Sequence, residues 1–95
     1  MFMVRIYRRK EFSIYSGNGG FIVHNTKKEF SNGHTHISNF HTAKFLIDMS
    51  IRKLIPYKVS PYLLESLIRL SNDETYTEKI RKEILRVSKK KAKHK

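Results

Sequence analysis

The amino-acid sequence predicts a single α+β domain in which a three-stranded antiparallel β-meander is followed by three α-helices, in the order βββααα. Two patterns and the size of the chain support this prediction. Apolar and polar residues alternate with the period of strands through residues 1–25, whereas apolar residues recur at helical spacing through residues 40–88. The 95 residues, 39% of them hydrophobic, suffice for one core, so we expect one domain over residues 1–88.

Three short segments carry the strand pattern. In MVRIYRR, Val4 and Ile6 are expected on the face that meets the core. Arg5 and Tyr7 then point to the opposite, solvent-facing side. EFSIYS and GFIVHN continue the alternation, and the GNGG segment between them supplies an Asn-Gly pair, which favours a tight hairpin turn because both central positions need positive φ. These segments predict a meander whose apolar face needs a covering helix.

Residues 26–39 are expected to form a long loop, because they are rich in Thr, Lys, Ser, Asn and Gly. Phe30 and Ile37 are isolated apolar residues in this segment. A short fourth strand within KKEFSN is an alternative. A loop of this length in a small domain often serves function.

The first helix is expected over residues 40–54. Apolar side chains at helical spacing form a face broad enough to be covered on two sides. Ser38 or Asn39 can cap the N-terminus by accepting a hydrogen bond from a free backbone N–H. Pro56 prevents the helix from continuing.

Two more helices are expected after the first. A serine followed by a proline at residues 60–61 is a typical helix start and predicts a helix over residues 61–70. The last helix is expected to start near residues 73–75 and to run to about residue 88, with Thr75 and Glu78 as a capping box.

Charge is the strongest global feature of the chain. It holds 20 Lys and Arg against 8 Asp and Glu, a formal net charge of +12, which favours a polyanionic partner. Basic clusters occupy residues 5–10, residues 27–28 and residues 89–95, and the last of these lacks any apolar pattern and is expected to form a disordered tail. The expected partner is nucleic acid, DNA or RNA. An acidic protein or a nucleoprotein complex is the other partner that this charge would attract.

Composition disfavours several other classes of protein. There is no cysteine, which excludes a disulfide framework and a thiolate zinc site. Arg5, Arg8 and Arg9 precede any apolar stretch of signal-peptide length, so we expect no secretory signal and a cytoplasmic protein. The most apolar window, residues 40–55, contains charged side chains and is not expected to enter a membrane.

These features predict a nucleic-acid-binding protein without catalytic activity and without a cofactor. Basic clusters that neutralise phosphates release counterions and create affinity without sequence specificity. Tyr7 and Tyr15 are expected beside the arginines on the solvent face, where their rings can stack on bases. The sequence has no phosphate-binding glycine loop and no nucleophile elbow. The expected binding residues are Arg5, Tyr7, Arg8, Arg9, Lys10, Tyr15, Lys27, Lys28, Lys89, Lys90 and Lys91.

A three-stranded meander followed by a helix resembles the architecture of small DNA-binding domains of the integrase-arm and AP2 types. The resemblance lies in the order of elements over the first half of the chain, and no signature residue matches. A twisted sheet of this kind can enter a major groove.

A protein-interaction factor is the first alternative. It would be an inhibitor or adaptor that docks on a nucleic-acid-processing enzyme, and a small basic chain without motifs fits the products of phages or mobile elements. Salt dependence separates the two functions, because phosphate binding weakens steeply as salt rises and a hydrophobic interface weakens less.

The histidines suggest a second alternative, a metal-dependent nuclease. His34, His36 and His41 fall within NGHTHISNFHTAK, and three histidines with a water would form a catalytic zinc arrangement. A strand that ends at His24 before a helix resembles ββα-type metal nucleases, but the paired histidine of that motif is missing. Glu29 is the one acid between His24 and His41, so a carboxylate that would orient the histidines is not supplied locally. We therefore expect these histidines to be polar loop residues that line the binding surface.

Overall fold

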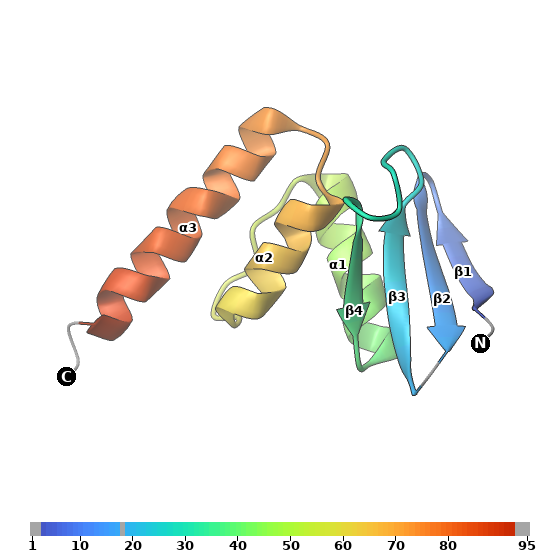
Figure 1. Ribbon diagram of the computed structural model, residues 1–95. Coiled ribbons are helices and arrows are strands. Elements are labelled where there is room, and N and C mark those ends of the chain that lie inside the picture. The colour runs from blue at the N-terminus through green and yellow to red at the C-terminus, as the bar shows by residue number, and fades with distance from the viewer. Residues whose placement is uncertain (1–2, 18, 93–95) are drawn as a thin grey trace.

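A computed structural model describes residues 3–17 and 19–92 of the chain, with side chains described as far as Ser88. Four strands precede three helices, which confirms the predicted α+β class with one strand more than expected. Figure 1 shows the sheet at one end of the molecule, α3 at the other, and α1 and α2 between them. The elements are β1 (Val4–Arg9), β2 (Phe12–Gly17), β3 (Gly20–Asn25), β4 (His34–Ile37), α1 (Phe40–Arg52), α2 (Pro61–Leu70) and α3 (Glu74–Ala92).

The sheet is an antiparallel meander in which neighbours in sequence are neighbours in space, in the order β1-β2-β3-β4. A tight turn joins β1 to β2, with Lys10 in the left-handed region at φ 53°. The expected Asn-Gly turn joins β2 to β3. Gly19 has φ 78° there, as a tight hairpin turn requires, while Asn18 lies outside the described residues.

The fourth strand corrects the expectation of an unbroken loop over residues 26–39. β4 pairs with β3 through His34–Ile37, whereas KKEFSN, the alternative position, forms turns. Thr35 and Ile37 are buried on the inner side of the sheet. The strand is only four residues long, and two of its residues are histidines, so its period of two was too short to recognise among the polar residues around it.

A β-bulge in β1 corrects the predicted orientation of its side chains. Arg5 lies opposite Tyr15 and Tyr7 lies opposite Ile14, which leaves Ile6 as an extra residue. One inserted residue exchanges the two faces of a strand. Tyr7 therefore points to the inner side with Ile14, which is fully buried, while Ile6 is 45% exposed. Val4, also expected in the core, is 57% exposed near the start of the edge strand.

The hydrophobic core lies between the inner side of the sheet and the helices α1 and α2 (Figure 1). α3 packs mainly on α2 and adds two buried side chains to the core. The core residues with no more than 1% exposure are Ile14, Val23, Ala43, Leu46, Ile47, Leu64, Leu67, Leu70 and Ile80.

Polar caps set the ends of the first two helices. The side chain of Asn39 accepts a hydrogen bond from the backbone N–H of Thr42 at 3.1 Å, which confirms one of the two expected caps of α1. This helix ends at Arg52, where Lys53 takes a left-handed conformation with φ 56°. Ser60 caps α2, whose limits match the predicted residues 61–70.

α3 begins and ends differently from its prediction. The side chain of Asp73 accepts a hydrogen bond from the backbone N–H of Tyr76 at 3.1 Å, so Asp73 caps the helix and the expected capping box at Thr75 is not used. The helical backbone continues to Ala92, beyond the expected end at residue 88. Within the described residues, no helix is long and apolar enough to cross a membrane.

A buried tyrosine joins α3 to the end of α1. Tyr76 is 3% exposed, and its hydroxyl donates a hydrogen bond to the backbone carbonyl of Leu54 at 2.6 Å. Burial raises the pKa of Tyr76 to about 12, so this hydroxyl stays protonated and remains a donor.

Candidate nucleic-acid interface

The side of the sheet opposite the helices, here called the open face, carries side chains from all four strands. Strand pairing places these side chains in two rows that run across the sheet. α1 and α2 contact the sheet from the other side (Figure 1). The first row is Arg5, Tyr15, Ile22 and His36, and the second row is Arg8, Ser13, His24 and His34, in which Ser13 is fully buried.

The open face carries positive charge and no negative charge. Arg5 and Arg8 are exposed on β1, and the four strands contain none of the chain's eight acidic residues. Glu11 and Glu29 lie in the connections between strands, and the other six acids lie on the helices or at their ends. The electrostatic character of this face therefore favours an anionic ligand.

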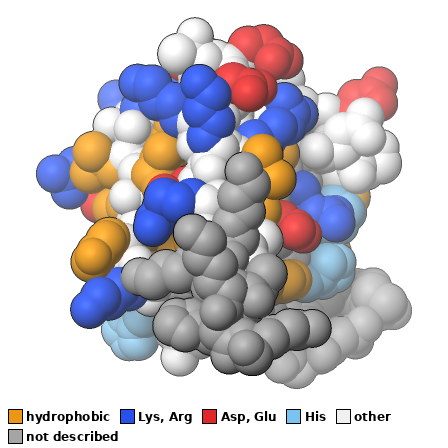
Figure 2. All heavy atoms as spheres, turned by 90° about the vertical axis from the view of Figure 1, so that its left-hand side faces the viewer, with side chains coloured by type: hydrophobic (Ala, Val, Ile, Leu, Met, Phe, Trp, Pro, Cys, Tyr) orange, Lys and Arg blue, Asp and Glu red, His pale blue; other side chains and the backbone are white. Residues whose placement is uncertain are grey.

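The positive charges of α3, in contrast, are mixed with negative ones. Arg81 forms an ion pair with Glu78 at 3.5 Å, and Arg86 forms one with Glu83 at 2.6 Å. Figure 2 looks at the molecule from the side of α3 and shows Lys and Arg side chains scattered among acidic and hydrophobic ones. The side chains of Lys89, Lys90 and Lys91, expected to bind nucleic acid, lie outside the described residues.

Tyr15 lies on the open face as expected, but Tyr7 does not. The bulge at Ile6 turns the ring of Tyr7 toward α1, where it packs edge-on against Phe40 with ring centroids 6.0 Å apart. The ammonium group of Lys44 lies 5.3 Å from the centre of the Tyr7 ring on the same side. Tyr7 is thus a packing residue, and its predicted position beside the arginines on the solvent face was wrong.

Arg9 also points to the inner side of the sheet. It lies opposite Phe12 and forms an ion pair with Asp48 of α1 at 3.2 Å, while Arg52 contacts the other oxygen of Asp48 at 3.2 Å. Desolvation raises the pKa of Asp48, but the hydrogen bonds and charges of the two arginines outweigh it and hold this pKa below its ordinary value. Arg9 therefore joins β1 to α1, whereas Arg5 and Arg8 have no such partner among the described residues.

The side chain of Lys28 caps the C-terminus of α2. Its ammonium group donates hydrogen bonds to the backbone carbonyls of Arg69 at 2.9 Å and Ser71 at 2.8 Å, and desolvation lowers its pKa. A cation at the carbonyl end of a helix is favoured by the helix dipole. Lys27, its neighbour in the predicted basic pair, is exposed, as is Lys10 in the first turn.

Three of the histidines lie on the open face, so they are on the expected surface, but they lie on β3 and β4 and not in a polar loop. His24 and His34 lie directly opposite each other, and the ring of Phe30 stacks on the ring of His34 at 4.2 Å with an angle of 6° between planes. The ring of His36 lies 5.1 Å from that of His34. A nitrogen of His24 hydrogen-bonds the carbonyl of Lys28 at 3.0 Å, which fixes its ring. These rings form an aromatic surface on the same side of the sheet as Arg5 and Arg8.

The expected alternative metal site is not formed by the described residues. His41 lies on α1, which packs against the inner side of the sheet, whereas His34 and His36 are on β4 and point to the open face. Within residues 3–17 and 19–92, no group of three His, Cys, Asp or Glu side chains is placed to hold a metal ion.

No family model, curated protein or solved structure matches this chain. Arg5, Arg8 and Tyr15 lie on the open face as predicted, and His34 and His36 were expected to line it from a polar loop. Their place on a strand, in rows with Ile22 and His24, was not predicted. The alternation in HTHI was the one local signal that could have placed His34 and His36 there.

Proposed function

We propose that this protein binds single-stranded nucleic acid on the open face of its sheet and does not catalyse a reaction on it. The single observation that carries the proposal is the pairing of Arg5 with Tyr15 in a row that continues to His36. A guanidinium group offers charged hydrogen bonds to a phosphate, and a neighbouring aromatic ring offers a stacking surface to a base. The two groups together match the alternating charge and aromatic character of a nucleotide chain.

The rings on this face favour a single strand over a duplex. The flat faces of bases are hidden by stacking within a duplex, so a protein ring can stack only on a base that is unpaired. Tyr15 on β2 and His36 on β4 provide such rings on the open face, with β3 between them, and His34 adds the face of its ring that Phe30 does not cover. We therefore expect the bases, and not only the phosphates, to contribute to affinity.

The overall charge supports an anionic partner of this kind. The chain carries a formal net charge of +12, and exposed Lys10 and Lys27 lie at the ends of the strands that form the open face. The lysines of residues 89–95 would add nonspecific attraction to phosphates. Action in the cytoplasm, where such nucleic acids are accessible, is part of the same proposal.

A protein-interaction factor is the second candidate, because β1 is an edge strand with exposed apolar side chains. Val4 is 57% exposed and Ile6 is 45% exposed. An edge strand can pair with a strand of a partner. The bulge at Ile6 disrupts the ladder at this point, so we rank this candidate second.

A binding titration tests the proposed function. Labelled single- and double-stranded DNA and RNA are titrated with the protein at two salt concentrations, with and without EDTA, and the oligonucleotides are then inspected on a gel. We expect preferred binding to single strands, a steep loss of affinity with salt, and intact oligonucleotides. Absence of binding at low salt would reject the proposal, and cleavage that EDTA abolishes would show a nuclease instead.

A further inference from the structure

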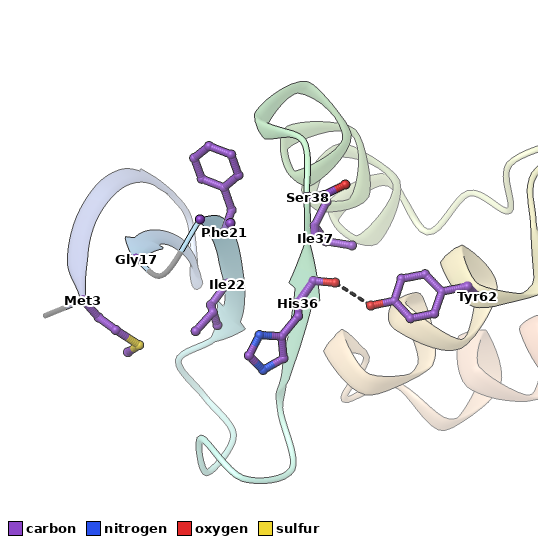
Figure 3. A pocket seen from close by; sticks show the side chains of 10 residues that line it. Met3, Gly17, Phe21, Ile22, His36, Ile37, Ser38 and Tyr62 are labelled. Carbon is purple, nitrogen blue, oxygen red and sulfur yellow. Dashed lines mark hydrogen bonds between the residues drawn. The ribbon is translucent and has the colours of Figure 1, made fainter. Parts of the chain in front are cut away.

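A pocket of about 480 Å³ lies beside the turn of the β2–β3 hairpin, at the edge of the open face. Its lining combines residues of the open face with Phe21 and Ile37 of the inner side and Tyr62 of α2. Its volume falls within the usual range for small-molecule sites. Figure 3 shows the side chains of Met3, Ile22 and His36 pointing to the same side of the sheet. Gly17 and Gly20, which lie opposite each other across β2 and β3, form part of the lining between them.

Gly20 has no side chain to fill this pocket, although its backbone conformation is one that other residues can adopt. Its φ is not in the left-handed region, unlike that of Gly19 in the turn. A Cβ atom built on Gly20 would meet the backbone oxygen of Ile37 at 3.6 Å, an ordinary van der Waals contact. Glycine in a strand commonly marks a place where a ligand approaches the backbone closely. A side chain at this position would occupy the pocket.

The lining of the pocket is mostly apolar with a few polar groups. Met3 and Ile22 supply apolar surface, and Ser38 and the ring of His36 supply groups that can form hydrogen bonds. The hydroxyl of Tyr62 donates its hydrogen to the backbone oxygen of His36, so its oxygen remains free to accept a hydrogen bond (Figure 3). A nucleobase combines apolar and polar surface in a similar way, because its two flat faces are apolar and its edge carries hydrogen-bonding groups.

We infer that this pocket holds one nucleobase of the single strand, an inference that rests on the proposed function of the open face. Ile22 and His36 line the pocket and also belong to the row that contains Arg5 and Tyr15. The pocket is therefore continuous with the positive surface, which would hold the phosphates while one base leaves the stack and enters the pocket. A neutral apolar ligand would gain nothing from the neighbouring arginines.

The four glycines of the chain allow a direct test by NMR on the unmodified protein. Gly17, Gly19 and Gly20 line the pocket, and Gly33 lies beyond the opposite end of β4 and serves as an internal control. Adenosine monophosphate is titrated into the ¹⁵N-labelled chain, with ribose 5-phosphate as the ligand that lacks a base. We expect the nucleotide to shift the amide signals of the three pocket glycines and leave that of Gly33 unchanged, and ribose 5-phosphate to shift none of them.

A substitution that fills the pocket gives a second measurement. Gly20→Val adds a side chain with room for its Cβ, and Ser31→Val adds the same side chain at an exposed position outside the pocket. We expect Gly20→Val to remove the nucleotide-induced shifts and to weaken oligonucleotide binding about tenfold. Ser31→Val should keep both the shifts and the affinity of the wild type.

The two proposals fail in different ways. Oligonucleotide binding by the wild-type chain without nucleotide shifts at the pocket glycines would reject the pocket and leave the proposed function standing. Equal shifts with ribose 5-phosphate would also reject it, because the base would then not be recognised. Failure of the wild-type chain to bind any oligonucleotide would reject both proposals.

Discussion

Arg5 and Tyr15 lie directly opposite each other on β1 and β2, and the bulge that follows at Ile6 divides the basic residues of β1 between two surfaces. Arg5 and Arg8 point to the open face. Arg9 points to the inner side and forms an ion pair with Asp48 of α1 at 3.2 Å. The same short strand therefore supplies candidate ligand contacts on one side and a contact to α1 on the other.

The two exposed arginines of β1 are expected to contact phosphates. Replacing both, as Arg5→Ala with Arg8→Ala, should weaken binding to single strands and reduce the slope of log affinity against log salt by about 1.4, because each lost phosphate contact on a single strand removes about 0.7. Fluorescence anisotropy titrations over a series of salt concentrations measure both quantities.

A second double variant controls for net charge. Lys79→Ala with Lys82→Ala also removes two positive charges, but from exposed positions on α3. We expect this variant to retain most of the affinity and the salt slope of the wild type. Equal losses in the two double variants would show that binding depends on overall charge and not on the open face.

Tyr15 is expected to stack on a base. Tyr15→Ala should cost about 2 kcal/mol of binding free energy, close to a thirtyfold loss of affinity, whereas Tyr15→Phe keeps the ring and most of the affinity. The ratio of the dissociation constants of the two variants for one oligonucleotide measures the contribution of the ring. Equal affinities for Tyr15→Ala and Tyr15→Phe would exclude stacking at this position.

Tyr7 is expected to stabilise the fold and not to bind nucleic acid. Its ring packs on Phe40 at 6.0 Å, so Tyr7→Ala should lower the free energy of unfolding by about 2 kcal/mol. Urea denaturation measures this change. A titration of the folded variant with oligonucleotide, without urea, should give an affinity like that of the wild type. A loss of affinity in the folded variant would contradict the inward position of Tyr7.

Lys28 is expected to act on stability through the end of α2. Lys28→Met keeps the apolar part of the side chain but removes the ammonium group that donates to the carbonyls of Arg69 and Ser71. The free energy of unfolding should fall by about 1 kcal/mol, whereas Lys27→Met at the exposed neighbouring position should leave it unchanged. Identical urea midpoints for the two variants would argue against this role.

Asp73 gives the fold a dependence on acidic pH. The backbone N–H of Tyr76 is the main cause that lowers the pKa of Asp73, and Lys53 adds to the effect at 3.6 Å. Because this pKa is lower in the folded protein than its ordinary value of 3.8, the carboxylate stabilises the fold above 3.8 and the contribution is lost as pH falls through the folded-state value.

The variant Asp73→Asn isolates this contribution, because asparagine can cap the helix but does not titrate. Urea unfolding at about pH 6 and about pH 3 compares the two proteins. We expect the wild type to lose more stability than Asp73→Asn between these two conditions. The same loss in both proteins would show that the carboxylate of Asp73 does not contribute.

Much of the secondary structure could be predicted because it depends on local pattern. The start of α2 follows from Ser60 and the proline after it, and Asn39 caps α1 as one of two predicted residues. The first three strands follow from alternation that extends over six residues each. These signals lie within a few residues of the element they define, so the chain carries them without any long-range contact.

The sequence by itself thus determined the α+β class, the positive charge and the approximate positions of six elements. Only the tertiary structure decided which side chains share a surface. A bulge at Ile6 depends on how β1 pairs with β2, and β4 depends on the neighbouring strand that completes its hydrogen bonds. Both are pairing events between separate segments, and one residue of register exchanges the two faces of a strand. For this reason Tyr7 and Arg9 do not lie on the predicted binding surface, and His34 and His36 lie on it as strand residues and not as loop residues.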